Sequence, residues 1–347
     1  IVNGILIEYT CVGRYIYPPG HGLRIATDCF EYIVRHHPHW QPISIIAAQL
    51  QPARANVVQE LAFSVTIAMA YIDAMLARGF DIDTVAPYFH FVINVDMDFF
   101  EGICKLRAFR KVWARLMKER YGAPRPEAMK LRVMTSPSTS SLTLQQPLNN
   151  IARVTTQAIA GILGGLQSLH TDSYDEVFST PTAEAARIAV ATQNILREEA
   201  QLTDVIDPLG GSYYVESLTD AMEAKINALI ERIDAAGGMY AAVEQGLVQR
   251  LIGDSALAFQ KKVDSGAQTL VGVNAYQVEE DPADYPSLAY PEPQRMQAYL
   301  SQLAAYKAQR SAADVARALD ALSAAAQSRD QNIFAQVVVA AEAGVTH

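Results

Sequence analysis

Cysteine is scarce in this sequence. The 347 residues include three cysteines, Cys11, Cys29 and Cys104, which are odd in number and widely spaced, and no CxxC pair occurs. This pattern argues against a disulfide framework or a zinc site and favours a reducing, cytoplasmic environment. Apolar runs are also short. None reaches about 18 residues, so we expect no membrane-spanning helix.

Positive charge is in short supply as well. Lysine and arginine total 28 against 37 acidic residues, which gives a net charge of -9. An acidic chain is a poor partner for nucleic acids or anionic membranes, so we expect neither, although a local basic groove for a phosphorylated cofactor is still allowed. The sequence starts at Ile1 without an initiator Met or a signal-peptide pattern, which is typical of a fragment or a processed chain.

Strand-like and helix-like segments alternate from residue 43 to residue 200. Short runs rich in β-branched and aromatic residues predict buried strands at 43–47, 88–93, 131–135 and 166–169. Amphipathic stretches predict a helix after each of them, at 55–79, 98–120, 147–163 and 182–200. Such alternation indicates a parallel sheet with right-handed crossovers. It fits half of a (β/α)8 barrel, which needs about twice as many units, or a small open α/β sheet.

The segments on either side of this alternation differ from it. The first 20 residues read as irregular and precede a helix at 22–36. We expect helices after residue 200 at 216–236, 238–246, 247–264, 294–309, 312–327 and 330–343, with a proline-containing acidic linker at 280–293. The sequence therefore predicts three parts: residues 1–200 around the sheet, residues 201–280 as a helical region, and residues 281–347 as a linker and C-terminal helices.

Several long motifs, in matching order, resemble the methylmalonyl-CoA mutase family of coenzyme-B12-dependent acyl-CoA mutases. The motifs are YIYPP (15–19), NNI (149–151), GGLQSLHTDSYDE (164–176), DPLGGSY (207–213), GGM (237–239), DSG (264–266) and VGVN (271–274). The resemblance implies a (β/α)8 TIM-barrel type of fold. It places the start of the chain at the end of the fourth barrel strand, so that strands five to eight, the C-terminal half of the barrel, and the helical region after it are present.

The resemblance also implies an activity and a cofactor. Members of the family carry out adenosylcobalamin-dependent radical rearrangements of acyl-CoA esters, and the cofactor supplies the difficult chemistry. None of the seven histidines lies in the family's Asp-x-His-x-x-Gly motif for B12 binding. We therefore expect an acyl-CoA substrate, a separate B12-binding subunit or domain that holds most of the cofactor, and a homo- or hetero-oligomer.

Substrate contacts are where this chain departs from the family. Gln49 stands at the family's His, which hydrogen-bonds the substrate's thioester carbonyl; a Gln amide can donate that bond but has no tunable pKa. The alternative for Gln49 is a polar cap on a strand end. Val12 stands at an Arg that pairs with a substrate carboxylate, unless Arg14 substitutes after a shift of the loop. Tyr88 stands at an Arg used on CoA phosphate, and Ser136 at a Gln.

An unpaired buried carboxylate is costly, so Val12 disfavours a dicarboxylic acyl-CoA. The cofactor positions match better: Gln167, His170 and Glu176 agree with the family, in which the acid faces the ribose of the adenosyl group. The alternatives are that His170 is a hydrogen-bonded residue that holds the loop after the strand, and that Glu176 is a surface acid. We assign no metal ligands, because Pro38 breaks the helix inside the cluster of histidines at 36, 37 and 39.

Two functions remain open on these residues. The first is an acyl-CoA mutase subunit that acts on a short acyl-CoA without a second carboxylate. The second is a non-catalytic homologue that keeps the scaffold as a binding or assembly partner. The second is motivated by Gln49, Val12, Ser140 and Pro52, which stand at the family's His, Arg, Trp and Glu.

Overall fold

The core of the structure is a parallel sheet whose strands follow one another in chain order. The computed structural model describes residues 2–3, 7–13, 17–281, 285 and 292–346. Its strands are β1 Val2–Asn3, β2 Ile43–Ile46, β3 Phe89–Val95, β4 Val133–Pro137 and β5 Ser168–Leu169. They form a five-stranded sheet of order β1-β2-β3-β4-β5. Doubly wound sheets reverse their strand order at a switch point, whereas this order is that of a partial TIM-barrel-like sheet.

Helices occupy most of the remaining chain. Those around the strands are α2 Pro19–His36, α3 Val57–Leu76, α4 Ile82–Val85, α5 Phe99–Arg115, α6 Pro126–Met129, α7 Asn149–Leu163 and α8 Ala183–Asn194. Those that follow are α9 Tyr213–Ala235, α10 Gly238–Glu244, α11 Leu247–Asp264, α12 Pro293–Gln309, α13 Ala312–Gln327 and α14 Ile333–Glu342. All the helices expected from the sequence are present, and π-helical turns extend α5 and α8 at their C-terminal ends.

Three differences from the sequence-based expectation stand out. The first 20 residues are not wholly irregular, because they contain β1 and a π-helical segment, Glu8–Val12. The single-turn helices α4 and α6 were not predicted. The last strand begins at Ser168 rather than at 166, so that Gln167 precedes it.

Side-chain caps fix where the long helices begin. Asn56 accepts a hydrogen bond from the Gln59 N–H, and the Gln59 side chain accepts one from the Asn56 N–H, both at 3.0 Å. This reciprocal capping box satisfies two otherwise free donors at the start of α3. Asp98 caps α5 in the same position, at 3.1 Å from the Glu101 N–H. Each cap starts its helix soon after the chain leaves the carboxyl end of a strand.

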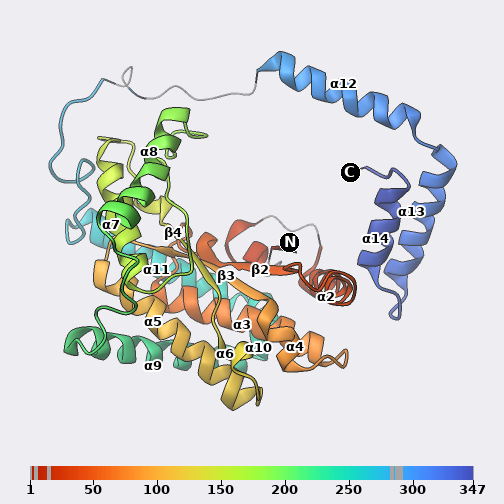
Figure 1. Ribbon diagram of the computed structural model, residues 1–347, viewed down its shortest axis with the longest axis horizontal. Coiled ribbons are helices and arrows are strands. Elements are labelled where there is room, and N and C mark those ends of the chain that lie inside the picture. Colours follow the sequence, from red (N-terminus) through yellow and green to blue (C-terminus); the bar gives the residue numbers. More distant parts are fainter. Residues whose placement is uncertain (1, 4–6, 14–16, 282–284, 286–291, 347) are drawn as a thin grey trace.

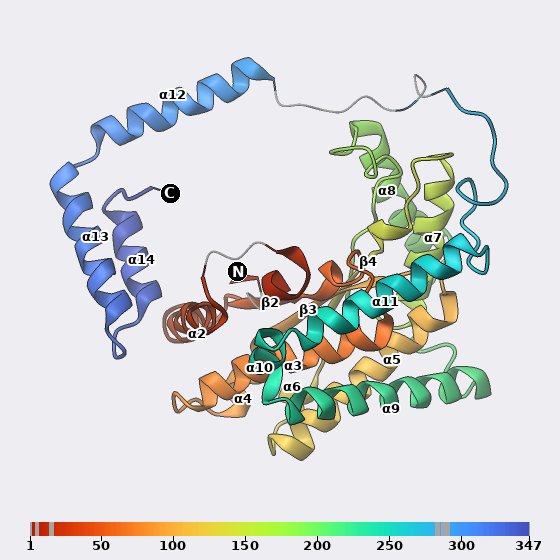
Figure 2. The ribbon, with the colours of Figure 1, turned by 180° about the vertical axis from the view of Figure 1, so that it is seen from behind.

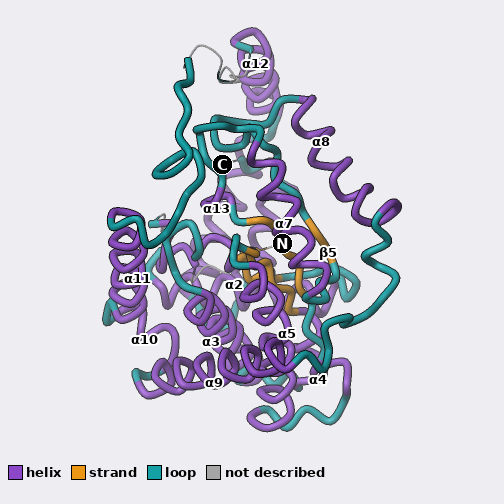
Figure 3. Tube along the Cα trace, turned by 90° about the vertical axis from the view of Figure 1, so that its left-hand side faces the viewer, coloured by secondary structure: helices purple, strands orange, loops and turns teal. Residues whose placement is uncertain are grey.

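Helices cover one face of the sheet. Phe91 of β3 contacts Phe109 and Trp113 of α5, with ring centroids 4.9 and 5.1 Å away. Helix α9 packs across α3 and α5, and Figures 1 and 3 show these three helices stacked below the strands. Alternate residues of β3, His90 and Val92, are half-buried and point to the opposite face. In a barrel that face would be the packed interior.

Helix α3 is apolar enough to invite a different interpretation. Among the described residues it is the one helix that is long and apolar enough to cross a membrane by length and composition. Of its most apolar stretch, 72% is buried inside the protein. The helix also carries Glu60, whose carboxylate is 2.6 Å from Lys105 Nζ of α5. Helix α3 is therefore a core helix of this fold.

Ion pairs hold α9 against α5 along its whole length. The cations lie on α5 and the turn after it, and the acids on α9: Arg107 with Glu216, Lys111 with Asp220, Arg115 with Glu223, and Arg120 with Asp234. Both series ascend together, so the two helices run parallel and begin at the same end of the sheet.

The last helices form an arm beyond the sheet. Helix α14 packs on α13 and on α2, where the Asp28 carboxylate accepts the Ile333 N–H at 2.8 Å. Tyr32 and Phe334 add an edge-to-face contact at 5.4 Å. Helix α12 has no buried residue among those described. Figures 1 and 2 show it apart from the sheet, leading into α13.

Candidate functional site

Polar side chains gather where the parallel strands end. Gln49 lies just after β2, Asn94 and Ser136 lie near the ends of β3 and β4, and His170 follows β5. The Asn94 side chain links its neighbours: Nδ2 donates to the Ala48 carbonyl at 2.7 Å, and Oδ1 accepts from Ser136 Oγ at 2.8 Å. The carboxyl ends of barrel strands are where such folds carry their working residues. This edge is therefore the candidate site.

Gln49 is presented by a tight turn. It ends the 3₁₀ segment Ala47–Gln49, in which Ala47 and Leu50 are buried while Gln49 is exposed. The Gln49 amide has no hydrogen-bond partner within the described part of the chain. It is thus a free donor and acceptor at the end of a strand, as the resemblance requires for a contact to a carbonyl group.

The loop after β5 brings three titratable groups together. His170 Nε2 lies 3.3 Å from Asp172 Oδ1; the His side chain is 52% exposed and the Asp side chain 2%. Asp172 Oδ2 is buried without a hydrogen-bond partner in the described structure. Glu176 joins them, and one ligand atom from each residue lies within 4.8 Å of the others. From the sequence we assigned no metal ligands; these atoms could share a cation or accept hydroxyl protons from a polar ligand.

The electrostatics of this loop follow from the same contacts. The hydrogen bond that His170 donates to the Asp172 carboxylate raises the pKa of His170 above its ordinary value of 6.5, against the opposing effect of burial. Burial raises the pKa of the Glu176 carboxyl, and the neighbouring Asp172 adds to that shift. The cluster therefore favours a protonated His and holds its protons more tightly than free side chains do.

We expect His170 to titrate above 6.5 in the folded protein. The folded state binds this proton more tightly than the unfolded chain, so the interaction stabilises the fold below the ordinary pKa and is lost as pH rises through the raised one. Asp172→Asn should lower the midpoint, measured by NMR of the imidazole. His90, whose pKa burial lowers, is the internal reference and should not change. A His170 midpoint that is the same in both proteins would contradict the assignment.

Two predicted site residues lie at the other end of the sheet. Tyr88 precedes β3, and its hydroxyl donates to the Pro38 carbonyl at 2.8 Å. Gln167 precedes β5, and its Oε1 accepts the Val133 N–H at 2.8 Å. Neither is brought close to Gln49, and Gln167 is separated from His170 by the length of β5. Only a ligand that extends along the strands could reach both ends.

The remaining substrate positions differ in what the structure says of them. Ser136 is half-buried and occupied by its bond to Asn94. Val12 ends the π-helical segment after β1, but its side chain lies outside what is described. Arg14, the proposed substitute, also lies outside the described residues.

Two residues of this edge were missed in the sequence. Asn94 interrupts the apolar run of β3, which is the one signal that could have identified it. Asp172 lies two places after His170, but its burial could not be read from the sequence. Both matter here because each contacts a predicted site residue or its turn.

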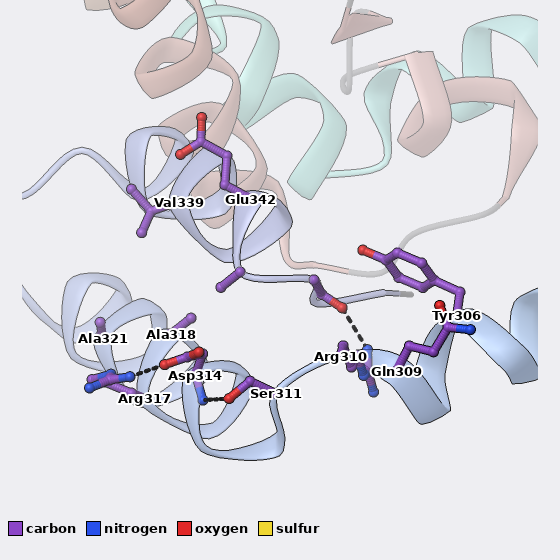
Figure 4. Close-up of a pocket in the computed structure, with 12 residues that line it drawn as sticks. Tyr306, Gln309, Arg310, Ser311, Asp314, Arg317, Ala318, Ala321, Val339 and Glu342 are labelled. Carbon is purple, nitrogen blue, oxygen red and sulfur yellow. Dashed lines mark hydrogen bonds and ion pairs between the residues drawn. The ribbon is translucent and has the colours of Figure 1, made fainter.

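A separate cavity lies in the C-terminal arm, away from the strand ends. It is lined by residues of α12, α13 and α14, and its volume is about 620 Å³. Two of its charged side chains have partners in the lining, as Figure 4 shows: Arg310 donates to the Gly344 carbonyl, and Arg317 pairs with Asp314. None of the residues expected from the sequence to form a site lines this cavity.

These features define an α/β protein of partial TIM-barrel-like type with polar side chains at the carboxyl ends of its strands. The family described as methylmalonyl-CoA mutase matches residues 1–347, and the chain belongs to this family. The relatives that it matches are named as mutases.

The relatives are longer than this chain. It is 40% identical over 347 residues to the methylmalonyl-CoA mutase of Escherichia coli (strain K12), of which it covers 48%, and 41% identical to that of Rhizobium meliloti (strain 1021), also with 48% covered. It is 36% identical over 342 residues to the 2-hydroxyisobutanoyl-CoA mutase large subunit of Aquincola tertiaricarbonis, of which it covers 61%. The chain thus spans about half the length of the curated methylmalonyl-CoA mutases it matches.

Proposed function

We propose that this chain is an acyl-CoA mutase-type isomerase subunit that carries out an adenosylcobalamin-dependent radical 1,2-rearrangement of a short acyl-CoA without a second carboxylate. One observation supports this most directly: in a chain of this family, the exposed Gln49 amide has no hydrogen-bond partner among the described residues and lies in the turn directly after β2, where a thioester carbonyl would accept its hydrogen bond. Tyr88 at the opposite end of the sheet suits the same ligand, because an acyl-CoA carries its nucleotide and acyl group at opposite ends of an extended arm.

The residues present fit part of the cofactor. Asp172, buried with a free Oδ2, and the half-buried Glu176 offer acceptors for the hydroxyl groups of a nucleoside next to His170. Adenosylcobalamin, when bound, would supply the radical chemistry. This chain would orient the acyl-CoA through Gln49 and exclude water. Most contacts to the corrin would come from a separate B12-binding subunit or domain.

The architecture belongs to the proposal too. The strands are proposed to be the end of barrel strand four and strands five to eight, the C-terminal half of a (β/α)8 barrel within residues 1–200. Residues 201–280 would then be the post-barrel helices, and 281–347 the linker and C-terminal helices. The complex is proposed to act in the cytoplasm, without nucleic acid or membrane.

Reconstitution tests the function. We expect negligible binding of adenosylcobalamin by residues 1–347 alone and measurable binding once a B12-domain subunit is added, both by calorimetry. Turnover should then appear with straight or branched four-carbon acyl-CoA esters and be absent with a dicarboxylic ester, because no cation is assigned to a second carboxylate. Tight cofactor binding by the isolated chain would overturn the division of labour, and turnover of a dicarboxylic ester the substrate class.

The open edges of the sheet predict that this chain associates with other chains. Strands β1 and β5 form the edges of the sheet as described, and unpaired edges pair with other chains. We expect residues 1–347 to form an oligomer or to pair with a chain that carries further barrel strands, as measured by light scattering at micromolar concentration. A monomer with a single cooperative melting transition would count against this.

A non-catalytic scaffold is the alternative. The valine at position 12 and the replacement of the family's His by Gln49 favour it, and the exposed helix α12 offers a surface for assembly. Absence of turnover with every short acyl-CoA, together with stable binding of a partner subunit, would favour this second function.

A further inference from the structure

The turn that carries Gln49 is held on both sides by residues from the end of β3. Before Gln49, the Ala48 carbonyl accepts from Asn94 Nδ2 at 2.7 Å. After it, Gln51 Nε2 donates to Asp96 Oδ2 at 2.9 Å. The two anchors fix the backbone from which the exposed Gln49 side chain extends, and so restrict where its amide can reach before any ligand arrives.

Asn94 itself has little freedom. It is 3% exposed, and each of its polar groups is used. Besides the bonds to Ala48 and Ser136, its N–H donates to Glu60 Oε1 at 3.0 Å and its carbonyl accepts from Lys105 Nζ at 2.5 Å. Glu60 and Lys105 also pair directly, at 2.6 Å. The strand end is thereby bound to α3 and α5 behind it.

The Glu60–Lys105 contact is a buried ion pair, and this type of interaction indicates what the network contributes. A buried ion pair is seldom worth more than apolar packing of the same volume, so burying Glu60 and Lys105 is a poor route to stability alone. A fully satisfied buried network, however, fixes one arrangement of the groups it joins. Here the arrangement that it fixes is the backbone of Asn94 and, through its side chain, the turn of Gln49 on β2.

We infer that Asn94 and Asp96 are positioning residues for Gln49, and that the buried Glu60–Lys105 pair locks Asn94 in place. The catalytic part of this inference rests on the proposed function, in which Gln49 contacts the substrate carbonyl. The structural part, that the turn is clamped from β3, stands without it. The two parts are tested by separate measurements.

Hydrogen exchange tests the clamp. Asn94→Ala in residues 1–347 should speed amide exchange across residues 47–51 at least about fivefold, because one hydrogen bond to the turn is lost. Asn150→Ala is the matched control: Asn150 is equally buried and holds a different loop through the N–H and carbonyl of Thr143. It should loosen residues 139–146 and leave 47–51 unchanged. Unchanged exchange at 47–51 in folded Asn94→Ala would overturn the inference.

A second variant covers the case in which Asn94→Ala does not fold. Gln51 is half-buried at the rim, so Gln51→Ala removes the other anchor without opening the core. It should speed exchange in the same segment by a similar factor. If the variants that fold leave amide exchange across residues 47–51 unchanged, the turn is not held by these two hydrogen bonds.

A double-mutant cycle tests the link to catalysis. In the reconstituted complex, Asn94→Ala should lower kcat by about tenfold to a hundredfold, because a displaced donor no longer meets the reacting group. In a Gln49→Ala background the same change should have little effect, since its target is gone. Equal losses in both backgrounds would mean that Asn94 acts elsewhere. An inactive parent would refute the proposed function, while the exchange result would still decide the clamp.

Discussion

Lys105→Met is expected to lower the free energy of unfolding by about 3–5 kcal/mol, the range seen when one partner of a buried ion pair is removed. The Lys105 side chain is 3% exposed and that of Glu60 0%. Methionine keeps most of the length of the lysine side chain but not its charge. The Glu60 carboxyl then has the Asn94 N–H as its remaining partner, and the Asn94 carbonyl loses the donor that Lys105 supplied. Burial raises the pKa of Glu60 and Lys105 opposes that shift, so without the lysine the buried carboxyl either stays charged without a counter-ion or takes up a proton, and both cost stability.

Urea unfolding followed by circular dichroism measures this change. Lys111→Met on the same helix is the matched control, because Lys111 is 38% exposed and pairs with the exposed Asp220, and exposed pairs are worth at most about 1 kcal/mol. Its second contact, with the buried Glu223 at 3.4 Å, leaves that carboxylate paired with Arg115 after the change. The double variant Glu60→Gln with Lys105→Met should recover part of the loss, since it leaves no buried charge. A Lys105→Met protein as stable as the Lys111→Met protein would show that Glu60 is not held in its charged form by this lysine.

The sheet was predictable because local patterns carry it. The run Ile43–Ile46 is apolar and rich in β-branched residues, and successive residues of Phe89–Val95 point to alternate faces of the sheet. Each segment therefore predicts a strand without help from its neighbours. Strand β1 could not be found this way: Val2–Asn3 is too short to show a period and exists because β2 lies beside it. The same holds for α4 and α6, each a single turn set by its neighbours.

The site was less predictable, because it depends on register. Gln49 could be placed at a strand end from the sequence, since the turn directly follows the strand. That Ser136 meets Asn94 depends on the parallel pairing of these two residues between β3 and β4, which the sequence does not show. The position of a strand boundary also decides whether a side chain lies at the amino end or the carboxyl end of a strand. Gln167 precedes the two-residue strand β5, whereas His170 follows it.

Gln49→Ala is expected to lower turnover in the reconstituted complex by about two to three orders of magnitude, the usual cost of removing one positioned donor to a developing charge. The donor would polarise and position the thioester carbonyl while the radical step moves no proton, so an amide can serve where the family uses an imidazole. Stability should not change, because Gln49 is exposed and its side chain makes no hydrogen bond within the described part of the chain. Gln49→His should keep or raise activity, since it restores a donor of the family's type.

The assay separates this role from its alternatives. Gln260→Ala makes the same chemical change at an exposed position of α11, and it should leave both turnover and the urea midpoint as they are. An active parent with an equally active Gln49→Ala variant would mean that Gln49 merely caps its strand. No turnover in the parent, with no effect of either change at position 49, is what a scaffold protein gives. A loss confined to Gln49→Ala, with Gln49→His active, is the result expected of a hydrogen-bond donor at this position, because glutamine and histidine can both donate and alanine cannot.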